Sequence, residues 1–122
     1  MTNAAVSTSE TAGPVTMRVS DELVRLYKDL FGRGPTKAGT HWAGDNILIC
    51  TLENSLTPAE RSMVEMGEYQ RLRDVRMFFQ HARENDFRET IERITGRQVR
   101  AFVSGIDPVT DVSAEVFYLE PI

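Results

Sequence analysis

Cysteine and histidine are scarce in this chain, which has one Cys and two His among its 122 residues. A single cysteine cannot form a disulfide within the chain, and three such side chains are too few for a structural zinc site. Basic residues are not in excess either, because 14 Lys and Arg stand against 18 Asp and Glu, which gives a net charge of -4. Nucleic-acid binding depends on clustered cations that contact phosphates. We therefore expect no nucleic-acid partner, no metal and no other cofactor.

Long apolar runs are also missing, since no stretch approaches the roughly 20 apolar residues that span a bilayer. We expect no direct membrane insertion. The apolar content of 41% suffices for one core, and this length is typical of one domain. Residues 1–17 are mostly small and polar, without the basic and apolar regions of a secretory signal. The sequence predicts a disordered N-terminal tail over residues 1–17, a single domain over 18–122, and a cytoplasmic location.

The first helix is predicted from the spacing of its apolar residues. Apolar side chains between Val19 and Leu30 recur at helical intervals and indicate a helix that ends near Phe31. Thr16 or Ser20 is placed to cap its start, because a side-chain oxygen there can accept a bond from a free backbone N–H. The glycines and the proline that follow residue 31 end the helix.

A second helical segment is expected over residues 58–95. Thr57 and Glu60 have the spacing of a capping box, which marks a helix start. Gly67 is the expected break, and a shift of the apolar stripe indicates a bend near Asn85.

The inner face of this segment is predicted from the same periodicity. Leu72, Val75 and Phe79 form one apolar stripe, and Ile91 continues it after the bend. We expect these side chains to pack on a sheet, with the first three almost fully buried.

Four strands are predicted, over residues 36–43, 46–53, 98–105 and 112–119. The second strand has four successive apolar residues, so we expect it inside the sheet with both faces covered. The first strand is more polar and is expected nearer an edge. The order α-β-β-α-β-β predicts an α+β fold, with a four-stranded mixed or antiparallel sheet and its helices mainly on one face.

Several short motifs point to a family. They are Leu-Tyr-Lys at residues 26–28, Phe-Gly-Arg-Gly-Pro-Thr-Lys at 31–37, Leu-Thr-Pro-Ala-Glu at 56–60, Val75-Arg76 with Phe79, Thr-Gly-Arg-Gln-Val at 95–99, and Val-Phe-Tyr-Leu-Glu at 116–120. With these motifs the chain resembles the MpsC-like family, over roughly residues 20–120. The resemblance implies a soluble accessory role in a Na+-translocating, membrane-potential-generating system, whose membrane-embedded component is a different polypeptide. It implies no catalytic residues.

The loop after the first helix is the sharpest candidate for a binding site. Its Arg33, Gly34, Thr36 and Lys37 offer two cations, a hydroxyl and a flexible backbone to a small anion. The alternative is a structural loop with solvated charges, and the helix C-terminus next to it disfavours anions. Arg76 is a further candidate, because it belongs to the family's pattern and can pair with a carboxylate.

Met66, Tyr69, Met77 and Phe78 are candidates for an interface, because they are apolar or aromatic and are expected to point outward from the second helical segment. Sheet edges need cover, and edge-protecting lysines are scarce. We therefore expect a homo-oligomer built from that segment, a hairpin edge, or both. A monomer in which the first helix covers these side chains is the alternative. A membrane transporter subunit is the other candidate partner.

Groups suited to catalysis are single and scattered. His41, His81 and Cys50 show no spacing of a catalytic constellation, and a thiol in an apolar strand does not have a lowered pKa. We therefore predict no catalytic residues and no enzyme, but a non-catalytic accessory or assembly module of an ion or bicarbonate uptake system or a membrane-potential-generating system. The alternative is a small sensor or enzyme that binds an anion or a metabolite with the loop of residues 33–37.

Overall fold

The computed structural model describes residues 14–122. Residues 1–13 of the predicted disordered tail lie outside this range, and the prediction is wrong for residues 15–17, which belong to the first helix. The elements are α2 (Val15–Phe31), β1 (Lys37–Trp42), β2 (Ile47–Glu53), α3 (Pro58–Glu65), α4 (Tyr69–Ala82), α5 (Glu84–Thr95), β3 (Val99–Asp107) and β4 (Val112–Leu119). The strands agree with the predicted ranges to within two residues at each end.

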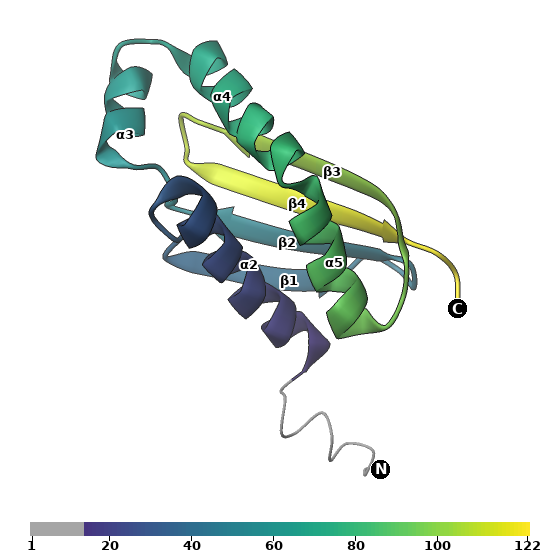
Figure 1. Cartoon of the computed structure of the whole chain (residues 1–122). Helices are drawn as coiled ribbons and strands as arrows, with labels where there is room; N and C mark the ends of the chain where they lie inside the picture. The colour runs from purple at the N-terminus through teal and green to yellow at the C-terminus, as the bar shows by residue number, and fades with distance from the viewer. Residues whose placement is uncertain (1–13) are drawn as a thin grey trace.

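The four strands form one antiparallel sheet in the order β1-β2-β4-β3. Helices α2, α4 and α5 lie across the same face of this sheet (Figure 1). The predicted α+β fold is confirmed, and the sheet is antiparallel, not mixed. β2 is an interior strand and β1 an edge strand, as their sequences indicated.

The prediction that both faces of β2 are covered is wrong. Leu48, Cys50 and Leu52 are buried, but the residues between them are only half-buried. Alternate side chains of a strand point to opposite faces, and the described helices lie on only one of them. A run of successive apolar residues therefore marks one core face and one open apolar face.

α2 packs on the sheet through the predicted stripe. Val19, Leu23 and Tyr27 are fully buried, and Gly32 ends the helix in a left-handed conformation with φ +81°. The helix begins earlier than predicted and is capped by neither Thr16 nor Ser20. These two residues lie inside the first turns, where the Ser20 hydroxyl instead lies 2.7 Å from the hydroxyl of Thr40 on β1.

The second helical segment is divided into three helices. Gly67, with φ +80°, separates α3 from α4 as predicted, and the second break falls at Arg83, two residues before the predicted bend. The capping box at the start of α3 is present, with both hydrogen bonds between Thr57 and Glu60. No residue of α3 is fully buried.

The predicted inner face of α4 is wrong, because the buried face is rotated about the helix axis by about the angle between successive residues. Leu72 is buried, but Val75 and Phe79 are 43% and 42% exposed. The buried stripe is instead Leu72, Arg76 and Gln80, at the i, i+4 and i+8 positions. Polar side chains occupy the inner face because each of them finds hydrogen-bonding partners beneath the helix, as described below. Ile91 of α5 is buried as predicted.

The corrected face predicts how truncations in α4 affect stability. We expect Leu72→Ala to lower the free energy of unfolding by about 2–5 kcal/mol, because it leaves a cavity in the core. Phe79→Ala should lower the free energy of unfolding by less than about 2 kcal/mol, because the ring is half-exposed. Val75→Ala, at a similarly exposed position of the same helix, is the control and should have an effect below the same limit. Urea unfolding measures all three. A Phe79→Ala variant as unstable as Leu72→Ala would contradict the observed orientation of α4.

Candidate functional site

A buried cation organises the polar layer beneath α4. Arg76 is 1% exposed, and its Nε and Nη2 atoms each donate a 2.7 Å hydrogen bond to the carboxylate of Glu60. Nη2 also donates to the carbonyl oxygen of Ser55 at 3.0 Å. The guanidinium carbon lies 3.7 Å from the centre of the Phe31 ring. Two-point contact with a carboxylate and stacking on an aromatic face are the contacts that compensate a buried guanidinium.

The partner of Arg76 is the same carboxylate that completes the capping box of α3. Burial alone would raise the pKa of Glu60, but hydrogen bonds from Arg76 and from the backbone N–H of Thr57 outweigh it, and the pKa lies below its usual value. Glu60 is therefore ionised at neutral pH. One carboxylate holds both the start of α3 and the middle of α4.

A second polar cluster lies between α2, α4 and the sheet. Glu115 of β4 is fully buried, and its Oε2 atom accepts hydrogen bonds from the Tyr27 hydroxyl and, at 2.6 Å, from Gln80 Nε2. Ser104 of β3 donates a 2.5 Å hydrogen bond to Gln80 Oε1. The other carboxylate oxygen, Oε1, is buried without a hydrogen-bond partner among the residues described.

The surroundings of Glu115 shift its titration toward neutrality. Burial raises the pKa of this carboxyl to about 7, and the surrounding hydrogen bonds and the charge of Arg76 limit the rise. An unpartnered buried oxygen is costly for an ionised carboxylate, since the charge loses its water. Glu115 thus changes its charge near neutral pH.

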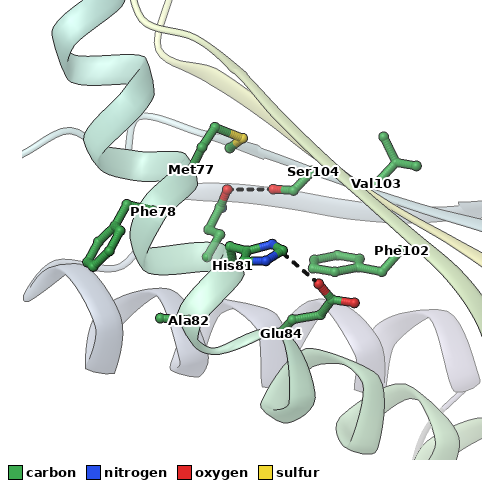
Figure 2. A pocket seen from close by; sticks show the side chains of 9 residues that line it. Met77, Phe78, His81, Ala82, Glu84, Phe102, Val103 and Ser104 are labelled. Atoms are coloured by element: carbon green, nitrogen blue, oxygen red, sulfur yellow. Dashed lines mark hydrogen bonds and ion pairs between the residues drawn. The ribbon is translucent and has the colours of Figure 1, made fainter.

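A cleft of about 590 Å³ opens between the C-terminal half of α4, the start of α5 and the edge strand β3. It is lined by Met77, Phe78, Gln80, His81, Ala82, Glu84, Phe102, Val103 and Ser104. Figure 2 shows Met77, Phe78 and His81 on the helix side, with Phe102, Val103 and Ser104 on the strand side. Phe78 is 68% exposed and Val103 is 55% exposed. The cleft therefore presents an apolar wall to its surroundings.

Polar groups in this cleft are few and already engaged. The Ser104–Gln80 hydrogen bond lies in the lining and connects the cleft to Glu115. At the other side, His81 Nδ1 lies 3.7 Å from Glu84 Oε1, as the dashed line in Figure 2 marks. An arrangement of apolar walls with a few paired polar groups suits an apolar side chain better than an ion.

The structure gives each predicted anion-binding cation a partner on the chain itself. Arg33 Nη1 donates to the carbonyl oxygen of Leu56 at 2.7 Å, and Lys37 Nζ lies 3.7 Å from Glu53 Oε2. The hydroxyl of Thr36 accepts a hydrogen bond from the Asn54 side chain at 2.9 Å.

The backbone of this loop lies close to α2. A Cβ atom added at Gly34 would come within 3.4 Å of Val24. Arg33 donates a hydrogen bond to the carbonyl oxygen of Leu56, and Arg76 donates one to the neighbouring carbonyl oxygen of Ser55. The loop therefore joins α2 to the connection between β2 and α3.

The predicted interface residues divide into two groups. Met77 and Phe78 come together at the cleft, although Met77 is half-buried. Met66 and Tyr69 are 70% and 42% exposed and lie at the break between α3 and α4, outside the lining of the cleft.

Glu115, Gln80 and Tyr27 were not among the predicted site residues. A signal for the first of them was present in the sequence, because the alternation of β4 places Glu115 on the same side as Phe117 and Leu119. An acid in an apolar stripe indicates a buried carboxyl group. Gln80 carried no such signal, since a glutamine on an amphipathic helix is ordinarily taken as exposed.

Cys50 behaves as the sequence indicated. It is fully buried, and burial raises the pKa of its thiol to about 11. Within residues 14–122, no group of three or more His, Cys, Asp or Glu side chains is arranged to hold a metal ion. Among the helices described, none has both the length and the apolar character required to cross a membrane.

A family model described as "Na+-translocating membrane potential-generating system (MpsC)" matches residues 11–121. Neither the curated proteins nor the solved structures gave a match.

The raised pKa of Glu115 predicts a pH-dependent stability. The unfolded chain, with Glu115 titrating near 4.5, loses this proton before the folded chain, which holds it up to about pH 7. The contribution of the protonated Glu115 carboxyl to the free energy of unfolding is complete below pH 4.5 and is lost as the pH rises through 7.

We therefore expect wild type to lose up to about 3 kcal/mol relative to Glu115→Gln between pH 4.5 and 8. Urea unfolding at several pH values measures this difference, in which the contributions of the other titrating groups cancel. A constant difference across the range would show that Glu115 titrates at its ordinary pKa.

Proposed function

Because the chain belongs to the MpsC family, we propose that it is a non-catalytic, soluble accessory or assembly subunit of a membrane-potential-generating system, and that it works in the cytoplasm. The family match supports the link to the system. The accessory role is supported by the surface of the molecule, and above all by the cleft between α4 and β3.

The exposed apolar cleft is the observation that carries this proposal. An aromatic side chain beside an apolar hollow is typical of a protein-binding surface, because the hollow accepts an anchor residue and the aromatic ring shields it from water. Phe78 stands 68% exposed at such a hollow. We propose that the cleft binds an apolar side chain of another protein of the system, such as a transporter subunit.

The buried polar groups support a structural rather than a catalytic use. The groups with displaced pKa values are Tyr27, Cys50, Glu60 and Glu115. Arg76 and Glu60 bind each other, and Tyr27 and Glu115 bind each other beneath the helices. The anion-binding alternative has less support, because Arg33 and Lys37 are already engaged with Leu56 and Glu53.

Self-association is part of the proposed role. The chain exposes apolar residues at two places, along α4 and on the face of the sheet that none of the described helices covers. Each exceeds the scattered single apolar residues of an ordinary surface.

The cleft can be tested by placing a charge in it. In cells of the source organism that lack the gene, we expect the wild-type chain to restore the Na+-dependent membrane potential and Phe78→Asp to leave it near the deleted level. The carboxylate would have to lose its water, without a partner, when an apolar side chain binds beside it, and this costs more than about 2 kcal/mol, or roughly 30-fold in affinity. A potential-sensitive dye provides the measurement.

Val109→Asp is the matched control, because Val109 is 60% exposed on the β3–β4 turn, away from the cleft. It should restore the potential fully, and circular dichroism should show both variants folded. Full restoration by Phe78→Asp would remove the cleft from the mechanism. An unchanged potential in the deleted cells would refute the accessory role itself.

A further inference from the structure

The face of the sheet opposite the helices, here called the open face, carries apolar residues where polar ones are expected. Antiparallel sheets with one solvated face ordinarily place polar residues outward and apolar residues inward. Over residues 112–116 of β4 the reverse holds, since Ser113 and Glu115 are buried while Val112, Ala114 and Val116 point to the open face. A strand with this pattern on a monomer leaves its apolar side in water.

Two neighbouring rows of the open face differ in size. In the first, here called the large row, Ile49, Val116 and Val103 lie side by side on β2, β4 and β3. In the next, here called the small row, the corresponding residues are Thr51, Ala114 and Gly105. The middle of the open face therefore has larger side chains in one row and smaller ones in the next, and these two rows carry no Lys, Arg, Asp or Glu.

Charges lie at the two ends of the open face. At one end, the Arg100 guanidinium lies 5.6 Å from the centre of the Tyr118 ring, next to the large row. At the other end, beyond the small row, Asp107 and Glu53 flank Val112. Lys37, on the edge strand, offsets only part of this negative charge. Along β3, Arg100 therefore lies at one end of the open face and Asp107 at the other.

From this complementarity we infer that the open face binds the open face of a second copy of this chain, forming a symmetric dimer. A two-fold axis that runs between the two rows, across the strands, turns the second sheet end for end. The large row of each copy then lies on the small row of the other, and Arg100 faces Asp107 of the second copy. Ridges fill hollows and opposite charges meet, as a self-complementary interface requires.

The other face-to-face arrangement is poorer. A two-fold axis along the strands would place the large row on itself and the small row on itself, with a gap over Ala114 and Gly105. Such a gap loses packing contacts. This axis would also place Arg100 over the end of the second sheet that carries the second copy's own Arg100.

This inference rests on the self-association proposed above and adds which surface mediates it. It differs from the prediction of an interface along α4 or a hairpin edge. Val103 alone among the residues named here belongs to both the open face and the cleft, so a dimer of this kind leaves α4 available for another protein.

Gly105→Val is the decisive variant. A Cβ atom at this position meets nothing within 4 Å in the single chain, and its φ lies outside the left-handed region, so the monomer accepts the larger side chain. In the dimer it would fill the hollow that receives the large row of the second copy. We expect it to raise the dimer dissociation constant by at least roughly tenfold.

Arg100→Glu tests the charge term, because it brings two acidic groups together at each end of the dimer. Phe78→Ser is the control, since Phe78 lies on α4 and outside the open face. The measurement is multi-angle light scattering of the full chain over a micromolar concentration series, with circular dichroism to show that each variant is folded.

The expected result is a wild-type mass near twice the 13.8 kDa of one chain. Gly105→Val and Arg100→Glu should shift this mass toward that of one chain, and Phe78→Ser should not. A dimer lost in Phe78→Ser but kept in Gly105→Val would overturn the open face and leave self-association standing. A wild-type monomer at all concentrations would overturn both, while the test of the cleft by membrane potential stays independent.

Discussion

Arg76 is a charged side chain that the fold has removed almost completely from water, and much of the surrounding architecture compensates for that removal. A buried guanidinium needs a carboxylate, further acceptors and close packing, because its desolvation costs several kcal/mol. Glu60, the Ser55 carbonyl oxygen and the Phe31 ring meet these needs. They belong to the start of α3, the connection after β2 and the end of α2. One cation on α4 thus fixes the positions of the connection from β2 to α3 and of the end of α2, which lies far from α4 in the sequence.

Much of the fold was predictable because its signals are local. The left-handed glycines at positions 32, 67 and 96 and the capping box of α3 depend on the chemistry of a few adjacent residues. The burial of Val19, Leu23 and Tyr27 follows from helical periodicity alone. The inner face of α4 was not predictable in this way, because periodicity assigns Arg and Gln to solvent, whereas partners distant in the sequence draw Arg76 and Gln80 inward.

The candidate site was predictable only in part for the same reason. Met77 and Phe78 were identified by being apolar on a helix that already had an inner stripe. The opposite wall of the cleft comes from β3, and its approach to α4 depends on strand order, which the sequence does not reveal. The apolar run of β2 predicts a strand covered on both sides, but it does not say by what. Such a run is compatible both with a second layer of the same chain and with a surface that another molecule covers.

Two inward positions of β4 carry polar side chains and neighbouring outward positions carry apolar ones, and the two facts are related. Glu115 and Ser113 occupy inward positions on β4 that apolar residues ordinarily fill. In the same part of the strand, Val112, Ala114 and Val116 lie on the open face, whereas Phe117 and Leu119 further along are buried. The core beneath α4 consequently depends on hydrogen bonds as well as on apolar contacts. We expect substitutions that change side-chain volume in this core to be tolerated less well than substitutions at the cleft.

The weak burial of α3 has a consequence for local unfolding. A helix of eight residues is too short to be stable alone, and α3 has no fully buried residue to anchor it. It is attached through Glu60, through Arg61, which pairs with Asp111, and through Met63 and Val64, which pack beside Leu72. Opening of α3 removes Glu60 from Arg76 and exposes the guanidinium to water at the same moment. Amide hydrogens of α3 and of the middle of α4 should accordingly exchange with solvent as one cooperative unit, below the free energy of global unfolding.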